Sequence, residues 1–219
     1  MSNIIAINGS PKTKDSVSGM IISQIEGIVG VSITTYQATK LIRREDTTET
    51  LSDVLKADIL LFVFPLYVDS LPAPLVKTLT LIERVIMAED LPPKKVFAIC
   101  NCGFLEAEHT RFALNIIENF CARAGMIWGY GVGIGSGGFI YSQRNNMSKG
   151  PAADVYSALC ALGKSLQTGD DRKQNVFATA KMPRFLYSAA GNFGWRQMAK
   201  KYKTGKALMA KPHIANGGK

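Results

Sequence analysis

The chain has 219 residues, 47% of them hydrophobic, which is enough for one core and a modest extension. It has no run of eighteen apolar residues, and its first residues lack the charged and apolar regions of a signal peptide. The four cysteines, Cys100, Cys102, Cys121 and Cys160, show no CxxC or Cys/His spacing, which argues against a disulfide scaffold, a zinc site and an iron–sulfur cluster. We therefore expect a soluble cytoplasmic protein with reduced thiols.

The positive charge is concentrated at the end of the chain. The formal net charge is +9, yet residues 1–171 hold 15 Lys and Arg against 17 Asp and Glu, whereas residues 172–219 hold 11 basic residues and no acid. We interpret these two ranges as a domain and a basic C-terminal extension. The extension also contains Phe185, Leu186, Tyr187, Phe193, Trp195, Met198 and Tyr202. An arm that acts by charge alone does not need such residues, so we expect it to dock on a surface.

Strand and helix patterns alternate along the first 171 residues. In chain order they predict strand 3–7, helix 17–29, strand 31–36, helix 50–56, strand 59–64, a helix from Pro74 or Leu75 to Met87, strand 95–100, helix 110–124, strand 126–134 and helix 152–166. The continuous apolar run at 59–64 is typical of a parallel strand covered on both faces. The fivefold alternation predicts an α/β protein with a parallel sheet between two helical layers.

The position of a ligand site follows from this topology. In an open parallel sheet, ligands bind outside the carboxyl ends of the strands, where the strand order reverses. For the five-stranded order 2-1-3-4-5 that point lies between the first and third strands. The loops that follow Ile7 and Phe64 are therefore the candidate binding loops.

The loop after Ile7, NGSPKTKDSVS, is polar and leads into a helix. Its backbone N–H groups, the hydroxyls of Ser10, Ser16 and Ser18 and the helix N-terminus converge where a phosphate group can bind, and Lys12 or Lys14 can add charge. The alternative is that Ser16 only caps the helix. GxxxxGK[ST] and GxGxxG are both missing, so a monophosphate suits this loop better than a nucleoside triphosphate.

The loop after Phe64, PLYVDSLPAPLVK, is apolar and stiffened by three prolines. Leu66, Tyr67 and Leu71 can lie against a flat aromatic ring; alternatively they only seal the core, for Leu71 in particular. In the next loop, NCGFLEAEHT, residues 101–103 can place backbone groups near the other edge of the ring, and Phe104 can cover the ring or simply pack. The Cys102 thiol has no resolving partner nearby, which favours a structural role.

Together with the glycine-rich stretch GYGVGIGSGG, these loops resemble the flavodoxin-fold NAD(P)H-dependent FMN reductase family and its NAD(P)H:quinone reductase relatives, over roughly residues 3–140. The resemblance implies a flavodoxin-like three-layer fold with a five-stranded sheet of order 2-1-3-4-5. It implies that FMN is bound at its phosphate by Ser10, Lys12, Ser16, Val17 and Ser18, and at its ring by Pro65, Leu66, Tyr67, Val68 and Asp69, with Asn101, Cys102 and Gly103 on the far side. The family more often has Asn-Thr where this chain has Ser16-Val17, so one hydroxyl ligand is missing.

The resemblance also implies an activity. FMN would take hydride from NAD(P)H and pass electrons to a quinone, another flavin or a similar small acceptor, with no catalytic side chain required. The two histidines, His109 and His213, have neither metal-ligand nor triad spacing, and residues 135–141 and 145–149 are expected to shape the open side of the site. The alternatives are a flavodoxin-type electron carrier, a class that is usually strongly acidic, and a regulatory flavin-binding module without turnover.

Three roles are open for the extension. It can wrap a second subunit in a homodimer or higher oligomer, lie on an anionic membrane surface, or pack on its own domain, where its lysines can meet the phosphate of NADPH. Gly191 and Gly194 argue against one uninterrupted helix, which favours packing or dimerisation over the membrane. We do not expect nucleic-acid binding, because no known reading element accompanies the charge.

Overall fold

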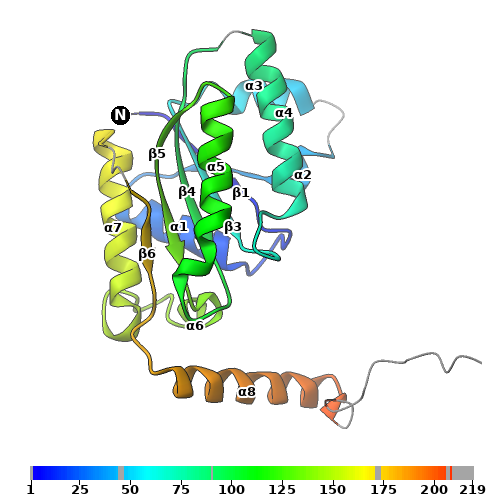
Figure 1. Cartoon of the computed structure of the whole chain (residues 1–219), viewed down its shortest axis with the longest axis vertical. Helices are drawn as coiled ribbons and strands as arrows, with labels where there is room; N and C mark the ends of the chain where they lie inside the picture. The colour runs from blue at the N-terminus through cyan, green and yellow to red at the C-terminus, as the bar shows by residue number, and fades with distance from the viewer. Residues whose placement is uncertain (1, 44–46, 90, 171–173, 206–207, 209–219) are drawn as a thin grey trace, which may run out of the picture. The chain divides into compact units, whose positions relative to one another are not determined.

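The computed structural model describes residues 2–43, 47–89, 91–170, 174–205 and 208, with residues 47–49 described by their backbone alone. The chain divides into two units, Met1–Lys181 and Met182–Lys219, and each is described here by itself. The first unit contains a parallel sheet with helices on both faces (Figure 1).

The sheet has six strands in the order β2-β1-β3-β4-β5-β6, all parallel. The strands are β1 (Ile4–Asn8), β2 (Thr34–Gln37), β3 (Ile59–Pro65), β4 (Lys95–Asn101), β5 (Ile127–Ile134) and β6 (Val176–Ala178). The predicted order of the first five strands is confirmed, but the prediction of five strands in total is wrong. The sixth strand pairs with β5, with Val132 opposite Val176, and it belongs to the range 172–219.

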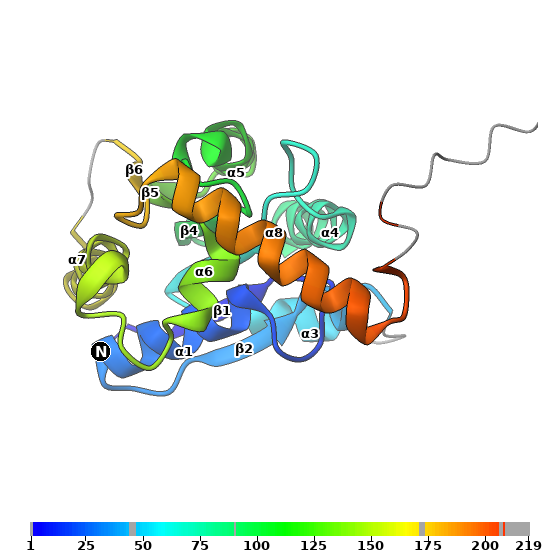
Figure 2. The ribbon, with the colours of Figure 1, turned by 90° about the horizontal axis from the view of Figure 1, so that it is seen from below.

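Helices cover both faces of the sheet. They are α1 (Val17–Val29), α2 (Ala38–Leu41), α3 (Thr47–Val54), α4 (Ala73–Glu89), α5 (Arg111–Arg123), α6 (Gly137–Ser142) and α7 (Ala153–Thr168). Seen along the strands in Figure 2, α1 and α7 lie on one side of the sheet and α4 and α5 on the other. The strand β3 shows why the sheet needs both layers: Phe62 and Phe64 are buried in the α4/α5 core, whereas Leu61 and Val63 are buried in the α1/α7 core. Successive side chains of a strand point to opposite faces, so a strand that is apolar throughout must be covered twice.

Several observed elements begin or end a few residues from their predicted bounds, and the start of β2 has a clear local reason. The strand β2 begins at Thr34 rather than Val31, because Gly30 ends α1 in the left-handed region (φ 72°) and the backbone N–H of Ile33 donates to the Glu26 carboxylate at 2.9 Å. These contacts hold residues 31–33 in the connection between α1 and β2, outside the strand. The glycine-rich stretch that ends β5 also starts the short helix α6, which the sequence analysis did not predict and which Ile140 anchors by packing in the α1/α7 core.

Among its described residues, the second unit contains the helix α8 (Arg184–Lys201). It continues through Gly191 and Gly194, so the expectation that these glycines interrupt a helix is wrong. Each costs about 1 kcal/mol relative to alanine, and the adjoining alanines, Arg196, Gln197 and Met198 are good helix formers that offset this cost. Several large side chains of α8 are exposed: Phe185, Leu186, Phe193, Trp195 and Met198. Within the described residues, no helix is both long and apolar enough to cross a membrane.

Candidate functional site at the carboxyl edge of the sheet

The two predicted binding loops lie side by side at the carboxyl edge, because β1 and β3 are neighbours in the sheet. From β1 the order runs outward to β2, and from β3 it runs the opposite way to β4, which makes this the switch point of the topology. Gly9 permits the close contact: its N–H donates to the Val63 carbonyl at 2.8 Å, and a Cβ atom would lie 2.8 Å from Cβ of Phe64. The start of the first loop is therefore packed directly on the end of β3.

The first loop is shaped by its own polar side chains. Asn8 Oδ1 accepts a hydrogen bond from the Ser10 N–H at 3.0 Å, and Ser10 Oγ accepts one from the Lys12 N–H at 3.3 Å. Ser16 caps α1, since its Oγ accepts from the Gly19 N–H at 3.0 Å. Ser16 therefore serves as the helix cap, and the unpaired N–H groups of the first turn of α1 remain as donors for an anion.

Ser18 lies deeper than the sequence suggests. Its side chain is 1% exposed, and its hydroxyl oxygen accepts a hydrogen bond from Nδ2 of Asn101 at 3.0 Å. The same Nδ2 donates to the carbonyl oxygen of Phe64 at 3.0 Å, and the Asn101 carbonyl accepts from the N–H of Leu66 at 2.8 Å. Asn101 thus joins the start of α1, the end of β3 and the end of β4 at the switch point. Both N–H bonds of its amide serve this clamp.

The second loop begins with a tight turn after β3. The N–H and carbonyl of Tyr67 each pair with Ser70 at 3.0 Å, and the two central residues, Val68 and Asp69, have φ of 50° and 56°. Turns of this kind favour Asn and Gly, because a left-handed backbone places Cβ too close to the carbonyl oxygen. Val68 is branched at Cβ and 98% exposed, so no packing within the chain compensates for the strain. Strained backbone of this kind clusters at ligand-binding sites, which makes Val68 a candidate ligand contact.

The strain at Val68 predicts that Val68→Asn stabilises the protein by about 1 kcal/mol, because Asn tolerates the left-handed region. Urea unfolding of the two proteins measures the difference. Val76→Asn is the matched control: Val76 is partly exposed on α4, where the backbone is helical, and this change should be neutral or slightly destabilising. A Val68→Asn protein less stable than the parent would contradict the strain.

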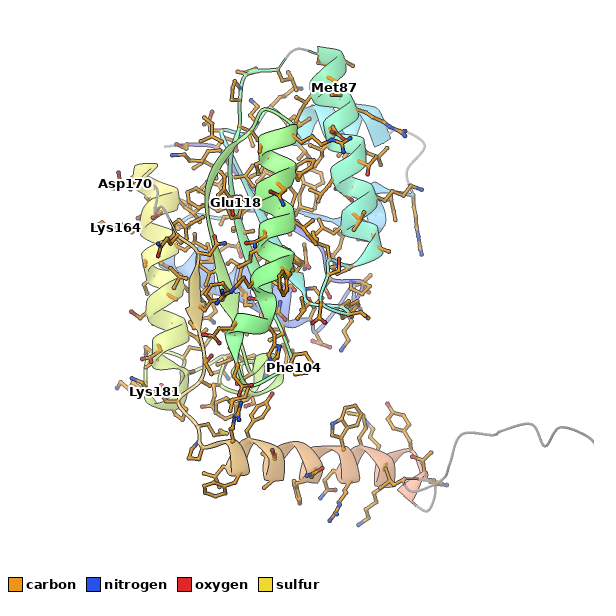
Figure 3. The ribbon with its side chains drawn as sticks, viewed as in Figure 1. Met87, Phe104, Glu118, Lys164, Asp170 and Lys181 are labelled. Carbon is orange, nitrogen blue, oxygen red and sulfur yellow. The ribbon has the colours of Figure 1, made fainter. Side chains whose placement is uncertain are left out.

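The third loop follows β4 and carries Cys102 and Phe104. Figure 3 shows Phe104 at the carboxyl end of the sheet, away from Met87 at the other end of the unit. Phe104 is half exposed and stacks on His109, with ring centroids 4.4 Å apart. The Cys102 thiol is buried, and burial, with smaller contributions from the carboxylates of Glu106 and Glu108, raises its pKa. Cys102 is therefore a neutral thiol at neutral pH, as the structural interpretation expects.

An open cavity of about 360 Å³ adjoins the first loop. Part of its lining comes from the loop and from α1: Asn8, Thr13, Lys14, Asp15, Ser16, Gly19, Met20, Ser23 and Gln24. The rest comes from the end of α6 and the segment after it, and consists of Tyr141, Arg144 and Asn145. Residues 135–141 and 145–149 were expected to shape the open side of the site, but Arg144 lies between these two ranges and was not predicted. No local motif marks this residue, which lies more than a hundred positions from the loop it faces.

The three predicted phosphate-loop hydroxyls, those of Ser10, Ser16 and Ser18, all have hydrogen-bond partners within the protein, and Lys12 of the same loop is exposed. The predicted ring residues 65–69 form the end of β3 and the turn that follows it. Residues 101–103 lie at the end of β4, the neighbouring strand in the sheet. Among the described residues, no group of three or more His, Cys, Asp or Glu side chains is arranged to bind a metal ion. The first loop thus offers hydrogen-bond donors to an anion. The turn after β3 offers apolar side chains and backbone groups to a ring.

The fold and site define a flavodoxin-like α/β protein with its candidate site at the switch point between β1 and β3.

No family profile and no curated protein sequence matches the chain. Solved structures do match. An NAD(P)H:quinone oxidoreductase from Methanothermobacter marburgensis has a TM-score of 0.53 at 14% identity, covering 76% of this chain and 97% of that one. An NADPH-quinone reductase from P. pentosaceus has a TM-score of 0.52 at 18% identity, with the same coverage. A Trp repressor binding protein from Bacillus subtilis has a TM-score of 0.50 at 15% identity, covering 60% and 83%. At these identities the likeness shows the shared fold.

Proposed function

We propose that this chain is an FMN-dependent oxidoreductase that takes hydride from NAD(P)H and passes electrons to a quinone, a flavin or a similar small acceptor. The observation that carries the proposal is the pairing of two loops of complementary chemistry at the switch point. The polar loop after β1 suits a phosphate, and the apolar turn after β3 suits a flat ring. Two of the similar solved structures, those of the quinone reductases, agree with this proposal.

The residues at this edge suit FMN in different ways. In the proposed site the phosphate contacts are made by Ser10, Lys12, Ser16, Val17 and Ser18, and the ring contacts by Pro65, Leu66, Tyr67, Val68 and Asp69, with Asn101, Cys102 and Gly103 beyond the ring. Because the Ser18 hydroxyl is engaged by Asn101, Ser18 would contribute its backbone N–H. Asn101 would act as a positioning residue, since its amide holds the loops together.

The bound flavin would supply the redox chemistry, accepting hydride and returning electrons to the acceptor. The protein's own contribution is to hold the turn 65–70 rigid through the paired Tyr67 and Ser70 backbones and to present Val68 outward. No residue is required as a nucleophile, which agrees with the raised pKa of the Cys102 thiol. The side chains at this edge therefore bind and orient.

The test is the absorption spectrum of the freshly purified protein, followed by anaerobic mixing with NADPH and, separately, NADH. A bound flavin that bleaches rapidly supports the oxidoreductase. A bound flavin that neither nucleotide reduces would instead support a flavodoxin-type electron carrier. A colourless protein that cannot be reconstituted with FMN would exclude both functions and leave a regulatory or binding module.

A further inference from the structure

The segment that follows α6 forms part of the wall of the cavity beside the first loop. The carbonyl oxygen of Arg144 accepts a hydrogen bond from Nε2 of Gln24, on α1, at 3.0 Å. This bond joins two segments 120 positions apart and fixes the backbone at Arg144 relative to the middle of α1. The segment is therefore held against the helix whose first turn points its N–H groups into the proposed phosphate site.

The guanidinium of Arg144 is also held in place. Its Nη1 donates to the Tyr141 carbonyl at 3.0 Å, and its Cζ atom lies 4.7 Å from the centroid of the Tyr141 ring. Within the described part of the chain it makes no ion pair. Most of its N–H groups are thus available to an oxyanion, and a guanidinium presents them in a planar fork that matches phosphate oxygens.

The charged groups that line the cavity are Lys14, Asp15 and Arg144. Their sum is one positive charge, to which the N-terminus of α1 adds its partial positive charge. Hydroxyl and amide groups surround them, including Thr13 and Asn145. An anion with several acceptor oxygens, such as a phosphomonoester, satisfies this lining better than a neutral ligand does.

Two features of the first loop leave a gap that Arg144 can fill. Position 17 is a valine, which has no hydroxyl, and the hydroxyl of Ser18 is buried and engaged by Asn101. The loop therefore supplies fewer side-chain ligands to a phosphate than the number of its serines suggests. Arg144 lines the same cavity as Ser16 of this loop and offers charge-assisted hydrogen bonds, which are stronger than those of a hydroxyl.

We propose that Arg144 binds the phosphate of FMN across this cavity and makes the site select FMN over riboflavin. The proposal rests on the proposed function, because it concerns the same site. It assigns to the segment after α6 a direct role in binding. It also adds a residue from outside the loop 9–18 to those that contact the phosphate.

The experiment is titration of the apoprotein with FMN and with riboflavin, followed by flavin fluorescence. We expect Arg144→Gln to weaken FMN binding about 10-fold to 100-fold and to change riboflavin binding less than about twofold. Arg144→Lys should retain part of the affinity because it keeps the charge. The matched control is Arg84→Gln on α4, which removes the same charge from an exposed position outside the cavity and should leave both affinities unchanged.

The outcomes separate this proposal from the function on which it rests. Unchanged FMN binding in Arg144→Gln, or an equal loss for FMN and riboflavin, would overturn the role of Arg144 while leaving the flavin site in place. If the parent protein binds neither flavin, the proposed function fails. The phosphate site is then decided by thermal unfolding with inorganic phosphate: stabilisation of the parent that Arg144→Gln abolishes supports the site, and no difference between them overturns it.

Discussion

Ending the chain after Gln174 is expected to lower the free energy of unfolding by about 4 kcal/mol relative to a chain that ends after Lys181. The seven residues between these ends contribute β6 and its flanks. Asn175 Oδ1 accepts from the Gly131 N–H at 2.7 Å, and Thr179 Oγ1 accepts from the Ala107 N–H at 3.0 Å. Each such bond contributes about 1 kcal/mol, and the pairing of β6 with β5 and the burial of Ala178 add the rest.

The comparison of the two shortened chains is internally controlled. Both lack Trp195, so Trp128 of β5 is the sole tryptophan in each and reports unfolding in urea from the strand next to β6. The chain that ends after Lys181 retains all six strands and should unfold in one transition. The shorter chain should unfold at lower urea and aggregate more readily, because β5 becomes an open edge. Equal midpoints would show that β6 adds nothing to the sheet.

The central strands and the binding loops could be predicted from the sequence, because their signals are local. The apolar run at 59–64 is typical of a strand buried on both faces. The helix α1 was predicted at its observed bounds, since its apolar spacing and its cap at Ser16 agree. β6 carries no comparable signal. It is three residues long within a basic segment, and it is a strand because β5 offers it an edge. The helix α6 depends on tertiary context in the same way, because Ile140 packs in the α1/α7 core.

The site shows a similar division. Composition predicted where a phosphate and a ring can bind, but not which polar groups the protein uses for itself. Ser18 and Asn101 each suited a ligand contact in the sequence, yet both are buried and satisfy one another, as buried polar groups must. Arg144 is the converse case, since a basic residue with no motif reaches the cavity only through the packing of its segment on α1. Because α8 is continuous, its two glycines no longer argue against a membrane role for the extension.

Asn101→Ala is expected to destabilise the protein by about 3 kcal/mol. The amide is 3% exposed and its Nδ2 donates to both Ser18 Oγ and the Phe64 carbonyl at 3.0 Å. Its removal leaves two buried acceptors without their donor, each at a cost of about 1–3 kcal/mol. For a unit of this size the midpoint of thermal unfolding should fall by about 6–12 °C.

Ser18→Ala and the double variant separate the clamp from a general packing defect. Ser18→Ala removes one of the two acceptors and should cost less than Asn101→Ala, because the bond to Phe64 remains. In the double variant the two effects should fall short of additivity by about 1 kcal/mol, the coupling expected of directly bonded side chains. Strict additivity would mean that the two side chains do not interact. The clamp joins the loops of the proposed flavin site, so the single variants should also weaken FMN binding, in the order of their destabilisation. If Asn101→Ala is destabilised but binds FMN with unchanged affinity, Asn101 stabilises the fold and does not position the flavin site.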